Sequence, residues 1–191
     1  QDTLSRFVKI YSFYGSDMKE QLFQPWLRQV VSTDGLEARE SLRHLQSDVE
    51  SLDQLTQMLY IDTRSHLPDD LLMVSDKTSM ANSIEARVPF LDYRLVEFVE
   101  TLPPHLKLRH FKGKYLHKKT AEKWLPKQVI KRKKKGFANP VNKWLRDRLS
   151  GYVNDCLLNE RSAVKMYFQP DYIRRIVADH EAGRQNYFRH I

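Results

Sequence analysis

The sequence predicts a mainly helical protein. Apolar residues recur at helical spacing in several segments, and no segment shows the sustained apolar–polar alternation of a half-buried strand. The chain also has only six glycines, which leaves little room for sheet-type turns. Its 191 residues, 41% of them hydrophobic, are enough for one core and few for two. We therefore expect a single domain over residues 1–191.

The N-terminal residues 7–13 are apolar without a clear period, which favours a strand end or a segment that packs on structure outside this chain. From residue 50 onward, Leu52, Leu55 and Leu59 recur at helical spacing. Pro68 should interrupt this helix and occupy the first turn of the next one, because a first-turn residue needs no N–H partner.

Three further segments are expected after this pair of helices. Residues 83–90 can run extended, because Val88 precedes a proline. A short helix carrying Leu95, Phe98 and Val99 should follow, between Pro89 and the proline pair at 103–104. After Pro140, one helix is expected to align its apolar residues Val141, Leu145, Leu149 and Tyr152.

The last expected helix begins at Pro170 and Asp171. It places Tyr172, Ile173, Ile176 and Val177 on one face, and Gly183 can end it in a left-handed conformation. The single cysteine, Cys156, lies in an apolar helical pattern that favours core packing. No apolar stretch approaches the roughly 20 residues of a membrane span, and the first residues are not those of a signal peptide. We expect a reducing, cytoplasmic location.

The positive charge is concentrated in one segment. The chain carries a net charge of +8, and residues 107–135 contain 13 lysines or arginines and one acid, Glu122. This segment alone therefore carries +12, and the remainder of the chain is about −4. Such a local excess predicts an anionic ligand at this segment.

The segment 67–92 is unusually rich in charge for plain core. If residues 68–81 are helical, Asp69, Asp76 and Lys77 lie at spacings of seven and eight and share one face beside apolar residues. Charged residues beside apolar ones suggest the wall of a cleft. A solvated helix face with acids and lysines is the alternative, and the pattern alone leaves both open.

Residues 67–92 resemble the signature of glutamine-hydrolysing asparagine synthetases, in which an LPDDLL-like helix start leads through D-[RK]-x-S-M-A-x-S-x-E-x-R-x-P-F-L-D. Residues 106–116 and 125–140, which include RKKKGF at 132–137, agree with the family in order and spacing. The departures are modest: Lys77 stands where arginine is common, His117 and Lys118 replace a Leu-Arg pair, and Lys133 replaces a proline.

The resemblance implies a fold. The chain would be the helical C-terminal portion of an α/β, PP-loop ATP pyrophosphatase-like synthetase domain. It would lack both the S-G-G-x-D-S loop that holds the ATP pyrophosphate and the N-terminal glutaminase domain, and the chain contains no G-G pair. The abrupt ends of the sequence favour a fragment, which we expect to be inactive alone.

The resemblance also implies roles for individual residues. Lys134 matches the catalytic lysine of the family, which stabilises negative charge in the transition states. Either Asp69 or Asp70 matches an acidic residue that orients the nucleotide side of the site. Binding of nucleotide or substrate is expected from four residues of the basic segment, Lys112, Lys114, Lys135 and Gly136. Solvated surface lysines remain an equal alternative for Lys112 and Lys114.

Five residues are expected to support the site rather than to react: Asp76, Lys77, Glu85, Arg87 and Phe137. Glu85 and Arg87 are expected to form a buried ion pair that fixes the turn at residues 84–89. Phe137 can anchor its loop in the core. No His, Cys or acidic cluster has zinc-ligand spacing, so we predict no metal held by this chain.

By resemblance, the intact enzyme activates aspartate with Mg2+ and ATP as an acyl-adenylate. Ammonia from glutamine then gives asparagine, AMP and pyrophosphate. Partners would be the glutaminase domain and the ATP-loop half of the synthetase domain, with a homodimer through exposed apolar surface as a further option. Two alternatives stay open. One is a related amidotransferase or β-lactam synthetase-like ligase with another acid substrate. The other is a basic helical module that binds nucleic acid through residues 131–135, although nucleic acid is the less favoured partner.

Overall fold

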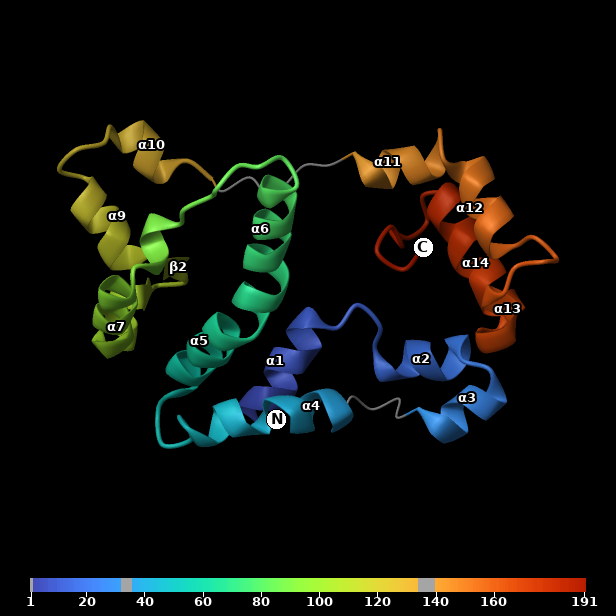
Figure 1. Ribbon diagram of the computed structural model, residues 1–191, viewed down its shortest axis with the longest axis horizontal. Coiled ribbons are helices and arrows are strands. Elements are labelled where there is room, and N and C mark those ends of the chain that lie inside the picture. Colours follow the sequence, from blue (N-terminus) through green and yellow to red (C-terminus); the bar gives the residue numbers. More distant parts are fainter. Residues whose placement is uncertain (1, 32–35, 134–139) are drawn as a thin grey trace. The chain divides into compact units, whose positions relative to one another are not determined.

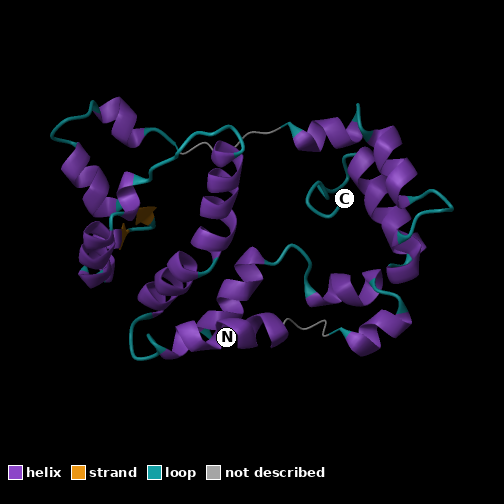
Figure 2. Cartoon of the chain, viewed as in Figure 1, coloured by secondary structure: helices purple, strands orange, loops and turns teal. Residues whose placement is uncertain are grey.

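The computed structural model describes residues 2–31, 36–133 and 140–191 (Figure 1). Helices dominate this part of the chain, and it contains two short strands (Figure 2). The predicted mainly helical fold is therefore confirmed. Chain contacts divide the protein into two compact units, the first formed by Gln1–Ser41 and Lys135–Ile191 and the second by Leu42–Lys134. The single-domain organisation stays a prediction.

The first unit is built from helices of both chain ends. They are α1 (Thr3–Tyr11), α2 (Ser16–Leu22), α3 (Pro25–Val30), α11 (Val141–Arg146), α12 (Ser150–Leu157), α13 (Val164–Tyr167) and α14 (Pro170–Glu181). Helix α4 (Leu36–Ser47) begins in the first unit and ends in the second. Within the described residues, no helix is long and apolar enough to cross a membrane.

The N-terminal segment is a helix, so the predicted strand end is wrong. The Asp2 side chain caps α1 by accepting from the Ser5 N–H at 2.9 Å. Leu4 and Phe7 are buried, and Tyr11 packs against Phe7 with ring centroids 4.8 Å apart. The interval from Leu4 through Phe7 to Tyr11 is a helical one, and it was hidden in the sequence by apolar residues on the exposed face, such as Ile10.

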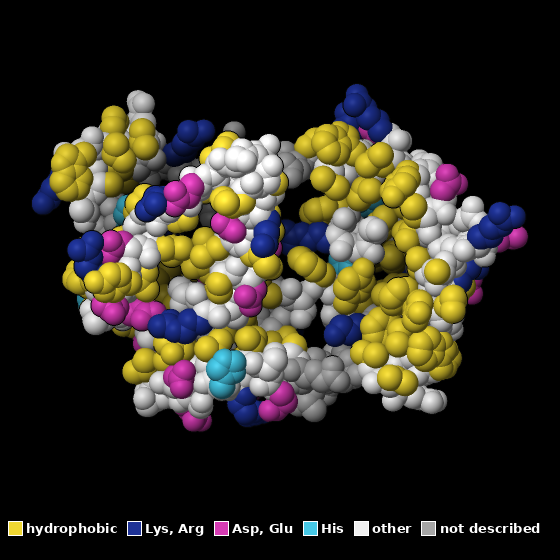
Figure 3. Space-filling model, viewed as in Figure 1, with side chains coloured by type: hydrophobic (Ala, Val, Ile, Leu, Met, Phe, Trp, Pro, Cys, Tyr) yellow, Lys and Arg dark blue, Asp and Glu magenta, His cyan; other side chains and the backbone are white. Residues whose placement is uncertain are grey.

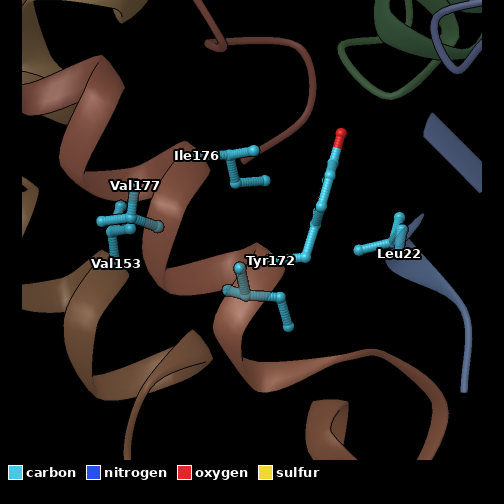
Figure 4. Packing of buried hydrophobic residues seen from close by; sticks show 6 residues of the cluster. Leu22, Val153, Tyr172, Ile176 and Val177 are labelled. Atoms are coloured by element: carbon cyan, nitrogen blue, oxygen red, sulfur yellow. The ribbon is translucent and has the colours of Figure 1, made fainter.

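The core of the first unit lies on α14, as the sequence predicted. Tyr172, Ile173, Ile176 and Val177 are buried there together with Val153 of α12 and Leu22 of α2. Figure 4 shows the Tyr172 ring standing between Ile176 and Leu22. Gly183 has a φ of +70° and ends α14, with the Arg184 N–H donating to the Asp179 carbonyl at 3.0 Å and the Gly183 N–H to the His180 carbonyl at 3.1 Å. This pair of bonds is a Schellman cap.

Backbone hydrogen bonds join the α2–α3 connection to the α13–α14 connection. The Gln24 N–H donates to the Tyr167 carbonyl at 2.8 Å, and the Gln169 N–H donates to the Leu22 carbonyl at 2.6 Å. The Trp26 indole N–H donates to the Met166 carbonyl at 3.1 Å while its ring remains half-exposed. On the face seen in Figure 3, hydrophobic side chains gather over α2, α3 and α13.

Two predictions for residues 141–157 are wrong. The expected single helix is two helices, because the chain turns at Asp147–Leu149 between α11 and α12. Cys156 is exposed, and Val153 is the residue of α12 that faces the core. The turn resets the helical phase, so a spacing counted from Val141 no longer identifies the buried face of α12.

The second unit contains the motif-bearing segments. Its elements are α5 (Gln54–Arg64), the π-helix η1 (Leu67–Leu72), α6 (Met73–Met80), the 3-10 turn η2 (Pro89–Leu91), α7 (Tyr93–Thr101), α8 (Pro104–Lys107), β1 (Leu108–Arg109), β2 (Lys112–Gly113), α9 (Tyr115–Ala121) and α10 (Lys127–Lys131).

Helix α5 begins later than predicted. Asp53 caps it by accepting from the N–H groups of Leu55 and Thr56, so Leu52 lies outside the helix. The buried residues of α5 are Gln57 and Ile61, whereas Leu59 is exposed. The predicted break before Pro68 is confirmed, because α5 ends at Arg64 and Pro68 lies in the first turn of η1.

A charged cluster joins α5 to α7 in the second unit. The Arg64 guanidinium contacts both carboxylate oxygens of Glu100, at 2.7 and 3.2 Å, and lies 3.6 Å from the centroid of the Tyr60 ring. The Lys107 ammonium donates to the Glu100 carbonyl oxygen at 3.0 Å. The hydrogen bonds from Arg64 to the Glu100 carboxylate raise the pKa of Arg64 above its ordinary value.

The predicted helix between Pro89 and Pro103 is α7, capped by the Asp92 side chain. Residues 84–88 before it form neither helix nor strand, whereas Ser83 has a φ of 57° and Pro89–Leu91 form η2, so the segment predicted to be extended, residues 83–90, is not extended at its two ends. Strands β1 and β2 form an antiparallel hairpin that the sequence did not predict. Its turn residues, His110 and Phe111, both have positive φ, whereas hairpins of this kind usually place asparagine and glycine there.

Candidate functional site

The segment LPDDLL is wound as the π-helix η1, which continues directly into α6. The Asp69 N–H donates to the Ser65 carbonyl at 3.0 Å across the break after α5. Asp69 and Asp70 are both exposed, and the Asp70 carboxylate lies 3.6 Å from Nδ1 of His66. Single π turns are frequent at functional sites, so this local winding makes the two acids candidates for a functional role.

The predicted common face of Asp69, Asp76 and Lys77 assumed a regular α-helix. A π turn closes its hydrogen bonds over i→i+5 and takes more residues than an α turn. Asp69 of η1 and Asp76 of α6 therefore do not have the angular relation that a regular α-helix would give them. Asp76 and Lys77 are exposed on α6. Their role in supporting the site stays a prediction.

Glu85 and Arg87 form the predicted ion pair, with 2.7 Å between Oε1 and the guanidinium. The pair is not buried, because the side chains are 69% and 83% exposed respectively. Residues 84–88 carry no secondary structure that would cover them. An exposed pair of this kind contributes little to stability, so the expected buried network is wrong for the described residues.

The basic segment forms a pocket between α9 and α10, with a volume of about 430 Å3. Its cationic side is contributed by Lys114, Lys118 and Arg132, with the imidazole of His117 beside them. Its apolar side is contributed by Ala121, Leu125, Val129 and Ile130. None of the described residues that line the pocket is acidic. Figure 3 shows hydrophobic side chains over α9 and α10 with lysine or arginine beside them.

The local fold explains how these cations converge. Lys114 ends the hairpin in a left-handed conformation, with φ of 59°, and immediately precedes α9. His117 and Lys118 follow it at three and four residues and Ala121 at seven, which is the spacing of one helix face. The His117 ring also meets Phe90 edge to face, with 5.6 Å between centroids.

Of the four residues predicted to bind nucleotide or substrate, Lys114 lines this pocket, and Lys112 lies on β2 outside its lining. Lys135 and Gly136 lie outside the described residues, as do Lys134 and Phe137. In the described part of the chain, neither Asp69 nor Asp70 forms an ion pair with Lys112 or Lys114. Within those residues, no group of three or more His, Cys, Asp or Glu is placed to hold a metal ion.

Sequence reasoning missed His117, Lys118 and Arg132 as pocket residues. The spacing of Lys114, His117, Lys118 and Ala121 was the available signal for the first two. Arg132 had no comparable signal, because it reaches the pocket from a separate helix end.

A family model described as asparagine synthase matches residues 4–191. The chain belongs to the asparagine synthase family. Synthase domains of this family are of the PP-loop ATP pyrophosphatase type, and this chain is consistent with a mainly helical part of one.

Several curated relatives carry the same family name. A glutamine-hydrolysing asparagine synthetase 1 of Bacillus subtilis is 29% identical over 97% of this chain and 28% of its own length. A putative asparagine synthetase of Mycobacterium bovis is 33% identical over 71% of this chain and 20% of its own length. The asparagine synthetase of Gallus gallus is 33% identical over 61% of this chain and 23% of its own length. The chain thus spans less than a third of these asparagine synthetases, and no solved structure gave a significant match.

Proposed function

We propose that this chain supplies the phosphate-binding wall of an ATP-dependent ligase that makes asparagine from aspartate. The observation that carries the proposal is the basic pocket between α9 and α10, in a chain of the asparagine synthase family. Lys114, Lys118 and Arg132 present positive charge to it without a carboxylate in the lining. An oligophosphate is the anion that best matches several converging cations.

The apolar side of the pocket strengthens this choice. Leu125, Val129 and Ile130 exclude water from one side, so the lysine and arginine charges are screened less than on an open surface. Pyrophosphate leaves during adenylation, and fixed cations stabilise the charge that grows on it. Lys114 and Arg132 therefore act on the leaving pyrophosphate. Arg132 is also close in sequence to the predicted catalytic Lys134, because only Lys133 separates them.

In the proposed reaction, an oxygen of the aspartate side-chain carboxylate attacks the α-phosphorus of ATP, and pyrophosphate leaves. Ammonia released from glutamine then attacks the acyl carbon, and AMP leaves with the bonding electrons. Lys134 stabilises negative charge in both steps. Asp69 or Asp70 orients the nucleotide side of the site, and the acid substrate is aspartate, with another carboxylic acid as the alternative.

The chain's own residues fit Mg2+ only together with ATP. This ion is usually held by one or two carboxylates and substrate phosphates, and Asp69 and Asp70 are exposed carboxylates of the second unit. When bound, Mg2+ neutralises phosphate charge. The chain lacks a G-G pair for an ATP pyrophosphate loop, so we propose that it needs that half of the synthetase domain and the glutaminase domain and is inactive alone.

The test is ATP–pyrophosphate exchange with aspartate in the intact protein that contains this chain. Lys134→Ala should lower the exchange rate about 100-fold or more, the usual cost of removing one group that stabilises transition-state charge. Lys127→Ala is the matched control, because Lys127 lies on α10 outside the pocket lining. Equal exchange rates in the two variants, or exchange supported only by another acid, would overturn the assignment of Lys134 or of aspartate.

A further inference from the structure

The first unit contains a second cavity, of about 350 Å3, which lies against its hydrophobic core and is partly open to solvent. The cavity is lined by residues of α2, α12, α13, α14 and the C-terminal turn. Its floor is formed by core residues Leu22, Ile173 and Ile176, which are at most 7% exposed.

The walls of this core cavity are almost entirely apolar. Phe23, Leu157, Val164 and Phe168 line it together with the core residues. An apolar hollow of this kind gains little from water, which needs two to four polar partners, but it favours an apolar ligand. A volume of about 350 Å3 is within the range of small-molecule sites in proteins.

One end of the cavity is fixed by hydrogen bonds. The Tyr14 hydroxyl donates to the His190 carbonyl at 2.7 Å, and the His190 ring lies edge to face with Tyr14 at 4.9 Å between centroids. The Nε2 of His190 lies 2.7 Å from the Phe13 carbonyl oxygen. These contacts tie the C-terminal turn to the residues before α2 and leave the Tyr14 hydroxyl already engaged.

Lys19 of α2 is the charged residue of the lining, and it is half-buried. Within the described residues its ammonium group forms no ion pair, and none of the residues that line the cavity is acidic. An ammonium beside apolar walls is stabilised by an anion that shares the same environment. The site therefore combines one positive charge with an apolar interior.

We propose that this cavity binds a small monocarboxylate with an apolar tail. The carboxylate pairs with the Lys19 ammonium, and the tail lies against Leu157, Val164 and Phe168 on the apolar wall. The ligand binds the folded first unit, so it stabilises that unit by mass action. This site lies in the other unit from the basic pocket and does not depend on the proposed ligase reaction.

Calorimetric titration of the 191-residue chain tests the proposal, with decanoate, 1-decanol and acetate as probes below the concentration at which decanoate forms micelles. We expect one decanoate per chain, bound about tenfold more tightly than 1-decanol, and no measurable heat from acetate. The tenfold margin is that of one charge-assisted contact. Decanoate should also raise the thermal unfolding midpoint.

Two variants separate the head-group contact from the tail contact. Lys19→Gln should weaken decanoate about tenfold and leave 1-decanol unchanged, whereas Lys9→Gln, an exposed lysine of α1 outside the lining, should change neither. Val164→Phe should weaken both probes by filling the cavity, with Leu157→Phe as a second filling variant if the first unfolds. Decanoate binding that exceeds one per chain, matches 1-decanol or survives Lys19→Gln would overturn the proposal.

Discussion

Gly183 and Gly151 should respond to alanine in opposite directions, because Gly183 follows the end of α14 and Gly151 lies in the first turn of α12. Gly183 has a φ of +70° and makes the Schellman cap of α14. Gly151 lies near the start of α12 with no positive φ, and a Cβ built there would meet nothing within 4 Å. The same Gly→Ala change at the two positions therefore separates the effect of backbone conformation from the effect of adding a methyl group.

The magnitudes follow from the two environments. A left-handed conformation costs an alanine about 1–2 kcal/mol in the folded state. Replacing glycine by alanine also reduces the conformational entropy of the unfolded chain, which stabilises the folded state by about 0.4–1 kcal/mol. A Cβ on Gly183 would lie 3.5 Å from Nη1 of Arg146, which is ordinary contact and adds no clash. Gly183→Ala should therefore lower the free energy of unfolding by about 1 kcal/mol, and Gly151→Ala should raise it by about 0.5 kcal/mol.

Urea denaturation followed by far-UV circular dichroism measures both changes. In a chain of this length, 1 kcal/mol corresponds to a shift of about 2–4 °C in the thermal midpoint. Gly183→Asn should fall between wild type and Gly183→Ala, because asparagine tolerates the left-handed conformation better. A neutral or stabilising Gly183→Ala, or equal losses at the two glycines, would refute the cap geometry.

Three further predictions concern single side chains. Burial, aided by the charge of Arg146, lowers the pKa of His180 from 6.5, so the free energy of unfolding should be constant above about pH 6.5 and fall as the pH drops below it. His180→Gln should reduce the difference between the urea midpoints at pH 7.5 and pH 5.5, and an unchanged difference would contradict the assignment. Asp53→Ala removes the cap of α5 and should cost about 1 kcal/mol in chemical denaturation, whereas no change would show that the cap is dispensable. Glu100→Gln breaks the pair with Arg64 and should cost about 0.5–1 kcal/mol in low salt and less in 1 M NaCl; a loss independent of salt would point to packing instead.

The sequence predicted elements well where local chemistry and tertiary packing agree. The last helix is the clearest case: Pro170 opens it, Tyr172 to Val177 carry its buried face, and Gly183 ends it as expected. The break before Pro68 was similarly predictable, because proline restricts the backbone whatever surrounds it.

Predictions failed where a local irregularity changed the helical phase. The turn at Asp147–Leu149 rotated α12, so Val153 became the core residue and Cys156 became exposed. The π winding of η1 did the same for the acids of the LPDDLL segment. No residue type specifies a π turn or an uncapped kink by itself, so these changes depend on packing that a sequence pattern does not contain.

The candidate site was predictable in its charge but only partly in its residues. The cluster of cations in residues 107–135 indicated an anionic ligand, and Lys114 does line the basic pocket. Arg132 and the apolar side formed by Val129 and Ile130 come from α10 and the residue after it, and their approach to α9 is a tertiary contact. Composition predicts the charge of a surface, whereas a pocket requires knowledge of which elements meet.

Pyrophosphate binding to the 191-residue chain is the most direct test of the basic pocket as a phosphate site. Calorimetric titration at fixed ionic strength should give one pyrophosphate per chain for wild type, with Lys114→Ala weakening the affinity about tenfold and Lys127→Ala leaving it within twofold. If both lysine variants weaken pyrophosphate binding equally, the segment is a diffuse basic surface and the account of a phosphate-binding pocket is wrong. The same conclusion follows if a single-stranded oligonucleotide displaces pyrophosphate and each lysine substitution weakens oligonucleotide binding equally.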